Sequence, residues 1–504
     1  MSARPAAARA RPLARYRPLK LLAKLPRAAL VCALVAALNA GAWAILVPAL
    51  QVPDEQSHYA YTEYLVQHGR PPAAGAADDR LSTSELNAAR AVKFEQVQFA
   101  PEDPAIWTAT EQRAMNALLA HGGDRGDGNG AASEVGVEPP LYYALQAIPY
   151  SIASGGTVLD RLQLMRLLSA LLAGVTVLFV FLFVREALPA VPETWTVGAL
   201  GVAFLPGFAF ISGGVNPDVL LYAASAALFY TLARGFRRGL DRRLALAIGA
   251  ATAAALMTKV NAFGLLPGVA VALMAMSLHR ERALRLRTFA LPALALGVAL
   301  APVLLEMLLN ATVWDRPVVG ATASKFGTRN IHPSLGTLLS YTWQFYVGPL
   351  PGLTHYFSGF SLRRLWIYNF VGLFGWVETS FRPLVYELAL VPIAAVAGLA
   401  ARTLLARRRR LRARLAELLS YGVLAALFLL FVAAASYIAH LRLGGSLGQL
   451  RYLLPLVPLY GAGLALAARG AGRRWTPAIG TAIVALAIAH DLFSQMMVIA
   501  RYYT

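Results

Sequence analysis

Residues 28–50 read AALVCALVAALNAGAWAILVPAL, and residues 51–58 continue the chain as QVPDEQSH. The first stretch is apolar and long enough to cross the hydrocarbon core of a bilayer as a helix. Eight Lys or Arg residues and no acid precede it in residues 1–27. The run is too long for a signal peptide, and residues 47–51 make a poor cleavage site. We therefore expect an uncleaved transmembrane helix behind a basic cytoplasmic N-terminus.

The composition extends this apolar character to the whole chain. Of its 504 residues, 58% are hydrophobic and 14% are charged, and the mean hydropathy is +0.55. These values exclude a soluble globular protein. The single cysteine, Cys32, excludes a disulfide framework or a thiolate zinc cluster within one chain. The net charge of +20 comes from short basic clusters between apolar runs, a pattern typical of membrane orientation signals, so we expect no nucleic acid partner.

Ten further apolar runs predict an all-α, polytopic membrane protein with about 11 transmembrane helices. The runs cover residues 162–184, 194–213, 218–233, 244–258, 261–278, 288–309, 384–401, 415–439, 452–468 and 475–498. Because no repeat or soluble appended region interrupts them, we expect residues 28–504 to form a single transmembrane domain. The glycine-rich residues 121–132, HGGDRGDGNGAA, predict a mobile loop insertion.

The segment at residues 139–153, PPLYYALQAIPYSIA, decides the orientation of the chain. It is short and contains three prolines, which indicates an interfacial or re-entrant element. Without it as a span, 28 of the 46 Lys and Arg residues lie on the cytoplasmic side; counting it as a span would move 20 of those 28 outside. The loops at residues 51–160 and 310–383 are therefore predicted to be extracytoplasmic, and the first of them holds 15 acids.

The residues directly after the first span carry the strongest chemical signal. Pro53 followed by two acids indicates the start of a helix. On that helix Asp54 and Glu55 precede His58 by four and three residues, so both carboxylates can approach one imidazole. A carboxylate at the membrane surface suits a general base or a cation ligand that meets a lipid-linked substrate. Alternatively, the acids only favour the helix N-terminus and pair with His58. A divalent cation is possible here without being required.

Five motifs support a resemblance to known enzymes. The Pro-Asp-Glu-x-x-His motif, Pro-Pro-Leu-Tyr-Tyr at 139–143 and Asn-Pro-Asp at 216–218 resemble motifs of the GT-C superfamily of polyprenyl-phosphate-sugar-dependent glycosyltransferases. Phe-Gly-Trp-Val-Glu-Thr at 374–379 and Gly-Gln-Leu-Arg-Tyr-Leu-Leu-Pro at 448–455 are similar to a bacterial envelope branch of that superfamily, long labelled only as a domain of unknown function. The resemblance runs from about residue 28 to the C-terminus.

The resemblance implies an inverting glycosyltransferase in the bacterial cytoplasmic (inner) membrane, active on the extracytoplasmic face. Its donor would be a polyprenyl-phosphate-linked sugar, its acceptor a cell-envelope glycan, lipid or protein, and its surroundings membrane lipid. Asp54 best matches the family's catalytic acid, with Glu55 as the alternative base or as a supporting ligand. A sugar hydroxyl needs a base to attack, whereas a phosphate leaving group needs positive charge.

Two basic residues are candidates for the site that binds this phosphate. Arg451 stands at the predicted outer start of a span, beside Tyr452 in the matched motif, and arginine binds phosphate through two parallel hydrogen bonds. Lys259 lies between two short apolar runs. The alternatives are a snorkelling arginine at a span end and a lysine in a tight outer turn. Arg363 and Arg364 come last, because an interfacial anchor beside nearby aromatic residues explains them.

Four more residues in or directly beside the matched motifs are candidate substrate ligands. Asp218 begins a helix, so helix capping is its alternative role. Glu138 precedes the two prolines, where relatives often have a histidine or another polar residue. Tyr142, like Tyr143, either stacks on a sugar ring or anchors the chain at the interface. Glu378 is a candidate ligand on the acceptor side.

A transporter or flippase of lipid-linked saccharide is the competing functional class. Transporters commonly have two related halves with interrupted helices in both, and this sequence has no such pairing. A scaffold with a decayed site is a third possibility. Phosphate-cradling Gly-x-x-x-x-Gly-Lys loops and His-Glu-x-x-His helices are missing from the sequence, which excludes ATP-driven and metallopeptidase chemistry of those types.

Overall fold

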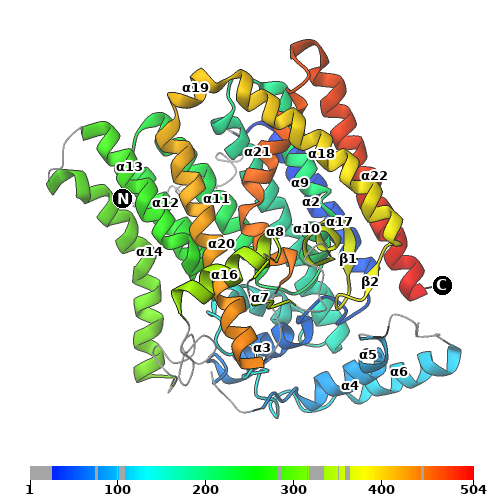
Figure 1. Cartoon of the computed structure of the whole chain (residues 1–504). Helices are drawn as coiled ribbons and strands as arrows, with labels where there is room; N and C mark the ends of the chain where they lie inside the picture. Colours follow the sequence, from blue (N-terminus) through cyan, green and yellow to red (C-terminus); the bar gives the residue numbers. More distant parts are fainter. Residues whose placement is uncertain are drawn as a thin grey trace, which may run out of the picture.

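The fold is almost entirely helical, which confirms the all-α class. A computed structural model describes residues 25–73, 78–98, 100, 108–281, 286–314, 316, 334–349, 351–352, 354–357, 364–443 and 448–503. Long helices pack side by side in one bundle, and the short helices α4, α5 and α6 gather at one end of it (Figure 1). Within the described ranges, the strands are limited to the antiparallel hairpin of β1 (Leu373–Phe374) and β2 (Thr379–Ser380).

Nine helices in the described part of the chain are long and apolar enough to cross a membrane. They are α2 (Arg27–Leu46), α8 (Val158–Ala187), α11 (Asp218–Arg238), α13 (Leu266–Glu281) with the turn η2 (Val260–Leu265), α14 (Leu286–Thr312), α18 (Pro383–Ala406), α20 (Leu415–Leu443), α21 (Val457–Ala468) with η4 (Leu450–Leu456), and α22 (Thr476–Tyr503) with η5 (Arg473–Trp475).

A tenth span is broken. The turn η1 (Pro192–Thr194) and α9 (Trp195–Ala203) meet α10 (Pro206–Ser212) at an angle of 59°. Pro206 causes the break, because proline disfavours helical backbone in the residue before it and cannot donate a hydrogen bond to the preceding turn. The prediction at residues 194–213 therefore corresponds to a bent pair of helices, not to one straight span.

The eleventh predicted span, at residues 244–258, is the helix α12 (Arg242–Leu256). Its 15 residues extend only about 22 Å, whereas the hydrocarbon core is about 30 Å thick. Among the described residues, nine helices are thus long and apolar enough to cross a membrane, or ten if the bent pair counts as one span. The sequence predicted eleven. α12 packs between α11 and α14 and ends just before Lys259, which bonds to an acid on α11.

The first helix packs into the bundle largely through small side chains. Along α2 the buried stripe includes Ala29, Ala36 and Ala40, whereas Leu38 on the other face is 65% exposed. α2 packs most extensively on α8, where a Cβ on Gly174 would lie 2.8 Å from the carbonyl oxygen of Ala33. Small residues at helix contacts and leucines outside are typical of helices packed within lipid.

The described part of the first long loop folds into five short helices. They are α3 (Glu55–His68), α4 (Thr83–Ala91), α5 (Phe94–Val97), α6 (Ala109–His121) and α7 (Leu141–Ile152). Reciprocal side-chain caps start two of them, Ser82 with Glu85 on α4 and Thr108 with Glu111 on α6. α7 covers most of the ambiguous segment at 139–153; its 12 residues are too few to span a bilayer, and it packs against α3 and α8.

The glycine-rich stretch at 121–132 is not a free insertion. The side chain of Asp127 accepts a hydrogen bond from the backbone nitrogen of Thr83, and the carbonyl of Asp124 accepts one from Ser84. Asn129 bonds through its side chain to the backbone of Arg80 and Asp78. The prediction of a mobile loop does not match these bonds, because its acids and amide tie the stretch to the start of α4.

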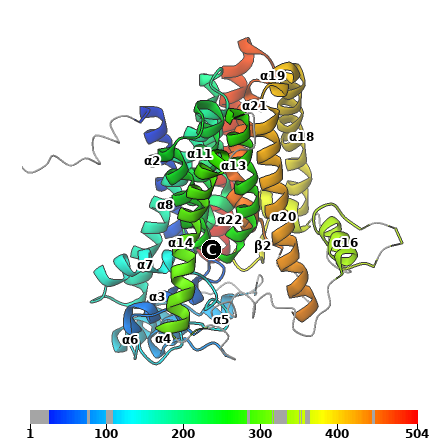
Figure 2. The ribbon, with the colours of Figure 1, turned by 90° about the vertical axis from the view of Figure 1, so that its left-hand side faces the viewer.

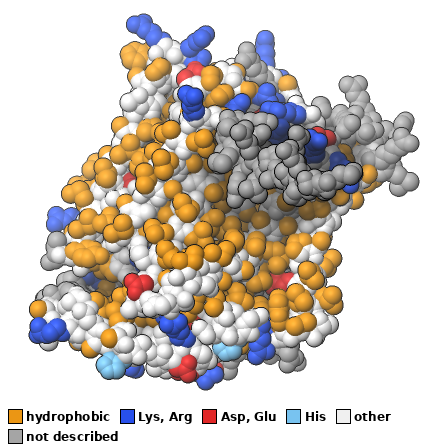
Figure 3. All heavy atoms as spheres, turned by 180° about the vertical axis from the view of Figure 1, so that it is seen from behind, with side chains coloured by type: hydrophobic (Ala, Val, Ile, Leu, Met, Phe, Trp, Pro, Cys, Tyr) orange, Lys and Arg blue, Asp and Glu red, His pale blue; other side chains and the backbone are white. Residues whose placement is uncertain are grey.

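The two ends of the bundle differ. Helices α3 to α6 lie at the end opposite the basic helix α19 (Arg408–Arg412), and α16 (Leu335–Tyr346) projects to one side (Figure 2). On the face seen in Figure 3, hydrophobic side chains fill the middle, and most Lys and Arg side chains lie toward the two ends. This pattern matches a bundle whose waist is in lipid. The remaining short elements are η3 (Arg364–Tyr368) and α17 (Asn369–Gly372), which lead into the hairpin.

Candidate functional site

The turn between α2 and α3 positions the two predicted acids differently. Leu50 and Asp54 both have positive φ angles, 68° and 63°, which non-glycine residues seldom adopt. Asp54 is the N-cap residue of α3, yet its side chain makes no capping hydrogen bond. The carboxylate of Glu55 turns into the protein and has no exposed surface. Adjacent residues therefore present their carboxylates to different surroundings.

Glu55 forms a fully bonded ion pair with Arg166 of α8. Oε1 of Glu55 accepts from Arg166 Nε at 2.8 Å, and Oε2 accepts from Nη2 at 2.5 Å. The backbone nitrogens of Leu50 and Val215 also donate to this carboxylate, each at 2.9 Å. Arg166 further donates to the carbonyls of Ala44, Val47 and Pro48 at the end of α2. The pair joins α2, α3 and α8 and leaves Glu55 no accessible oxygen.

Asp54 pairs instead with Arg451 at the start of η4. Asp54 Oδ2 lies 2.5 Å from Arg451 Nη2, and Arg451 Nη1 also donates to the carbonyl of Pro53 at 3.4 Å. The Asp54 side chain remains 26% exposed, whereas that of Arg451 is 5% exposed. Tyr222 of α11 holds the backbone of Arg451, because its hydroxyl donates to the Arg451 carbonyl at 3.0 Å. Asp54 is the accessible acid of the two.

A second acid–base pair lies beside the first. Lys259 Nζ lies 2.7 Å from Asp218 Oδ1, and both side chains are buried. Asp218 Oδ2 lies 3.9 Å from Arg451 Nε. Asn216 fixes this corner, because its side-chain oxygen accepts from the Asp218 backbone nitrogen and its amide donates to the carbonyl of Pro53. We call Asp54, Arg451, Asp218 and Lys259 the acid–base cluster.

The acid–base cluster contains polar atoms without partners. Neither Arg451 Nε nor Asp218 Oδ2 has a hydrogen-bond partner among the described residues, although both are buried. A small cavity of about 30 Å³ adjoins Arg451 and is lined by Pro53, Phe210, Gly375 and other residues. Unpaired buried polar atoms are costly and uncommon in folded proteins. The hydrogen-bonding atoms of the acid–base cluster are therefore not all occupied, whereas both carboxylate oxygens of Glu55 are.

The electrostatics of Asp54 reflect its neighbours. Burial opposes its ionisation, but the positive charges of Arg451, His58 and Lys259 outweigh burial and lower the pKa of its carboxyl to about 2. Asp54 is thus a carboxylate at neutral pH. Any group that draws Arg451 away from it would raise this pKa.

Three more of the predicted residues surround the acid–base cluster. The ring of Tyr452 lies under both cations, with Arg451 Cζ 5.0 Å and Lys259 Nζ 5.3 Å from its centroid. Its hydroxyl accepts from Arg451 Nη2 at 3.1 Å. Glu138 Oε2 accepts from the backbone nitrogen of Val260, next to Lys259. His58 Nδ1 lies 3.0 Å from the hydroxyl of Tyr143.

Other predicted residues lie elsewhere. Tyr142 is fully buried against α8, and its hydroxyl lies 3.1 Å from Ser169, so Tyr143 is the tyrosine that contacts His58. Glu378 sits in the turn of the hairpin, where Thr379 donates to it at 3.2 Å. Among the described residues, no hydrogen bond or ion pair connects Glu378 with the acid–base cluster. Arg363 lies outside the described residues, as does the side chain of Arg364.

Several residues of this region were not singled out from the sequence. Arg166 is the clearest, and the signal was available, because an arginine inside an apolar run predicts a buried partner. Tyr222 gave no comparable signal, because aromatic residues are ordinary in transmembrane helices. In the described part of the chain, no group of three or more His, Cys, Asp or Glu residues is placed to hold a metal ion.

The helix bundle defines a polytopic membrane protein. The acid–base cluster lies at the junction of its first loop and its helices. The chain belongs to the family of predicted membrane proteins described as DUF2142, whose sequence model matches residues 38–460. This match confirms the resemblance to a multi-spanning family of unknown function. None of the curated proteins compared with the chain matches it.

Two solved structures are similar to this fold. One is ArnT from Cupriavidus metallidurans bound to undecaprenyl phosphate, with 14% identity and a TM-score of 0.48 over 90% of this chain and 63% of that chain. The other is the Archaeoglobus fulgidus oligosaccharyltransferase in the apo form, with 14% identity and a TM-score of 0.47 over 94% of this chain and 56% of that chain. The chain thus spans about three fifths of their lengths.

Proposed function

We propose that the acid–base cluster is the active site of an inverting glycosyltransferase. The enzyme would move a sugar from a polyprenyl-phosphate donor to a cell-envelope acceptor on the extracytoplasmic face of the membrane. The observation that carries this proposal is the Asp54–Arg451 pair. In it an accessible carboxylate lies against a buried guanidinium whose Nε has no hydrogen-bond partner among the described residues. The motif resemblance supplies the donor class.

The two cations suit the leaving group. Arg451 and Lys259 face one another across Asp218 and Tyr452, so a phosphate that enters here meets two positive charges. Such fixed charges stabilise the negative charge that develops on the phosphate as its bond to the sugar breaks. Tyr452 presents its hydroxyl to Arg451 and covers both cations.

Asp54 suits the role of base. The acceptor oxygen attacks the anomeric carbon, the bond from that carbon to the phosphate oxygen breaks, and polyprenyl phosphate leaves with the bonding electrons. The acceptor hydroxyl proton passes to the Asp54 carboxylate. A single displacement inverts the configuration at the anomeric carbon. Glu55 is unsuited to this step, because Arg166 and two backbone nitrogens occupy its oxygens.

Donor binding can activate the base. In the free protein Arg451 holds the pKa of Asp54 at about 2, which makes Asp54 a weak base. A donor phosphate that takes over Arg451 removes the main positive neighbour of Asp54, and the pKa of Asp54 then rises. Asp54 therefore becomes a stronger base only when a donor is present.

The direct test is sugar transfer by the purified protein. The reaction contains a polyprenyl-phosphate-linked sugar and an envelope extract as acceptor, and Asp54→Asn is compared with wild type. Asp78→Asn is the matched control, because Asp78 lies in the same loop with 71% of its side chain exposed. We expect similar transfer rates in wild type and in the control and a strongly reduced rate in Asp54→Asn. Equal transfer by Asp54→Asn would disprove the assignment of the base.

The same preparation separates an enzyme from a transporter. Protein reconstituted in vesicles is supplied with the lipid-linked sugar, and movement of that lipid between leaflets is measured. Translocation without any sugar transfer would favour the flippase alternative. A reporter fused after Ser154 tests the orientation; cytoplasmic reporter activity there would contradict the extracytoplasmic site.

A further inference from the structure

A cavity in the first loop lies away from the acid–base cluster. It has a volume of about 460 Å³ and is formed by α4, α6, the glycine-rich stretch and the first turn of α8. Volumes of this size are typical of sites for small molecules. We call it the arginine pocket, because Arg125 and Arg161 both line it.

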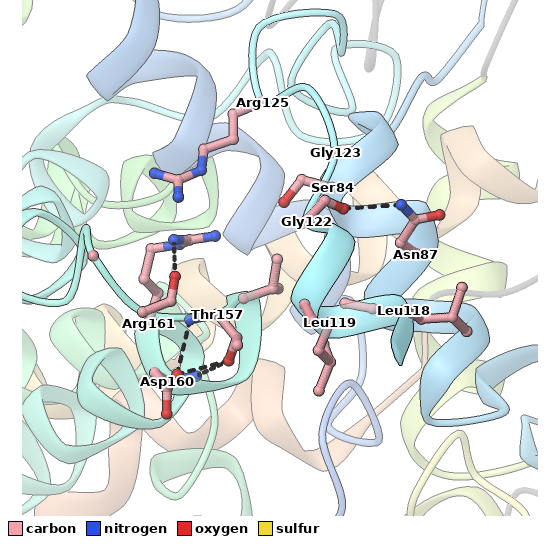
Figure 4. Close-up of a pocket in the computed structure, with 15 residues that line it drawn as sticks. Ser84, Asn87, Leu118, Leu119, Gly122, Gly123, Arg125, Thr157, Asp160 and Arg161 are labelled. Atoms are coloured by element: carbon pink, nitrogen blue, oxygen red, sulfur yellow. Dashed lines mark hydrogen bonds between the residues drawn. The ribbon is translucent and has the colours of Figure 1, made fainter. Parts of the chain in front are cut away.

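The two arginines form one wall of the arginine pocket. Both Nη atoms of Arg125 lie 3.2 Å from the carbonyl oxygen of Ser154, and Nη1 of Arg161 lies 3.4 Å from the same oxygen. In Figure 4 their guanidinium groups lie next to each other, whereas Asn87, Leu118 and Leu119 lie on the other side. Two like charges are thus brought to one carbonyl oxygen.

No carboxylate of the described residues forms an ion pair with either arginine within 4.0 Å. The nearest acids have other partners. Asp160 lines the pocket, but its carboxylate caps the first turn of α8 through Thr157. Glu63 does not line the pocket and accepts from Ser82 at 2.5 Å and from Tyr150 at 2.8 Å. Burial raises the pKa of its carboxyl, and the positive charges of Arg161 and Arg125 partly oppose that rise. The arginine pair is therefore arranged to receive an external anion.

Arg161 is held rigidly in this position. Its side chain is 1% exposed, its Nε donates to the hydroxyl of Tyr59 at 2.8 Å, and its Nη1 donates to the carbonyl of Gly156 at 2.7 Å. The backbone also needs its glycines here, because a Cβ on Gly123, where φ is 128°, would lie 2.8 Å from the backbone nitrogen of Ser84. A preorganised cation in a pocket closed by packed backbone is a built site and not a chance surface patch.

We propose that the arginine pocket binds an oxyanion carried on a saccharide, a phosphate or carboxylate substituent of the glycan acceptor. This inference rests on the proposed function. The pocket fits the acceptor better than the donor, because α4 and α6 lie beyond the end of the bundle, where a glycan arrives from water (Figure 1). The phosphate of a lipid-linked donor stays close to the membrane. The rest of the volume accommodates the sugar ring against Asn87 and Leu119.

The arginine pocket is connected to the acid–base cluster through α3. Tyr59, which accepts the hydrogen bond from Arg161, lies five residues after Asp54. Five residues of helix extend about 7.5 Å. An acceptor held in the pocket is therefore anchored to the same helix that begins at the proposed base, and the anchor raises the local concentration of its hydroxyl groups near that base.

The test is a binding measurement that requires no sugar transfer. The full-length protein in detergent is titrated with glucose 1-phosphate, glucuronate, glucose and inorganic phosphate, and hydrogen exchange of residues 121–132 locates the binding. We expect the two anionic sugars to bind more tightly than glucose or phosphate and to slow exchange in this stretch. Arg125→Ala should weaken their binding at least tenfold, Arg125→Lys less, and Arg113→Ala, on the exposed face of α6, not at all.

Three outcomes would overturn the proposal. They are equal binding of glucose and its phosphate, binding that Arg125→Ala leaves unchanged, and binding of inorganic phosphate as tight as that of the sugar phosphate. The result also stands apart from the proposed function. Asp54→Asn is expected to bind both anionic sugars in the pocket normally, so loss of transfer and loss of pocket binding are separate failures.

Discussion

Two neighbouring acids, Asp54 and Glu55, each pair with an arginine, yet the two pairs are built for different purposes. The Glu55–Arg166 pair is fully buried, and each carboxylate oxygen accepts one hydrogen bond from the arginine and one from a backbone nitrogen. The Asp54–Arg451 pair is partly exposed and leaves Arg451 Nε without a partner. Saturation of the hydrogen bonds, and not the residue type, separates the structural pair from the one proposed to react.

The largest expected effect is on sugar transfer. Asp54→Asn keeps the size and the backbone preference of Asp54 but removes the proton acceptor. We expect the transfer rate to fall by about 10²- to 10⁴-fold, the usual contribution of a general base, while the protein stays folded. Single-turnover transfer and thermal unfolding of the same preparation measure the two quantities. If the loss of folded Asp54→Asn protein accounts for its whole loss of activity, the Asp54–Arg451 pair is structural in the same way as the Glu55–Arg166 pair.

Glu55→Gln should have the opposite profile. It leaves the buried charge of Arg166 without a counter-charge, and breaking a buried pair in this way costs about 3–5 kcal/mol. We expect a lower unfolding midpoint and loss of ordered protein, with activity per folded molecule largely retained. Equilibrium unfolding in mild detergent checks this. An unchanged midpoint would mean that the pair does not join α2, α3 and α8.

Arg451→Lys tests the geometry of the cation. Lysine keeps the positive charge but cannot contact Asp54 and a phosphate through a planar fork. We expect kcat/KM for the lipid-linked donor to fall by about 10- to 100-fold, which corresponds to one or two charge-assisted hydrogen bonds. Arg473→Lys, at an exposed position beside α22, is the control and should have no effect. If Arg451→Lys is as active as wild type, Arg451 contributes only its positive charge and not its planar geometry.

The smallest expected effect is on the pH profile. The pKa of Asp54 is lowered from 3.8 to about 2, so its ion pair stabilises the fold fully above pH 3.8 and is lost as the pH falls through about 2. The kcat/KM profile reports the free protein and should have no acid limb from Asp54 above pH 4. If a donor phosphate displaces Arg451, the limb in kcat should lie at higher pH. If the acid limbs of the kcat and kcat/KM profiles lie at the same pH, activation of Asp54 by the donor is contradicted.

The class of the protein was predictable from its sequence, but the number of spans was not. Hydropathy alone detects every apolar run, which is why the membrane assignment and most long helices follow from the composition. It does not detect where a helix breaks or stops. Pro206 bends one predicted span, and α12 ends after 15 residues next to Lys259, whose partner Asp218 lies on another helix.

The acid–base cluster was predictable in its members but not in their roles. Motif resemblance brought together Asp54, Arg451 and Asp218, and the place of Lys259 between two short apolar runs added the fourth member; all four are neighbours in space. The choice between Asp54 and Glu55 needed the fold, because their arginine partners lie 397 and 111 residues away along the chain. Distances of that kind leave no trace in local spacing, and the same is true of the two arginines that line the arginine pocket.

The bonds from Arg166 to the end of α2 have a consequence for how the protein is made. During synthesis α2 enters the membrane long before α8 exists, so the carbonyls of Ala44, Val47 and Pro48 then lack their donor. Arg166 in turn disfavours insertion of α8 until it reaches those carbonyls and Glu55, because a charged side chain in a membrane helix is costly without partners. The turn that holds Asp54 can therefore form only after α8 has inserted, and biogenesis of this protein must keep the first loop unfinished until then.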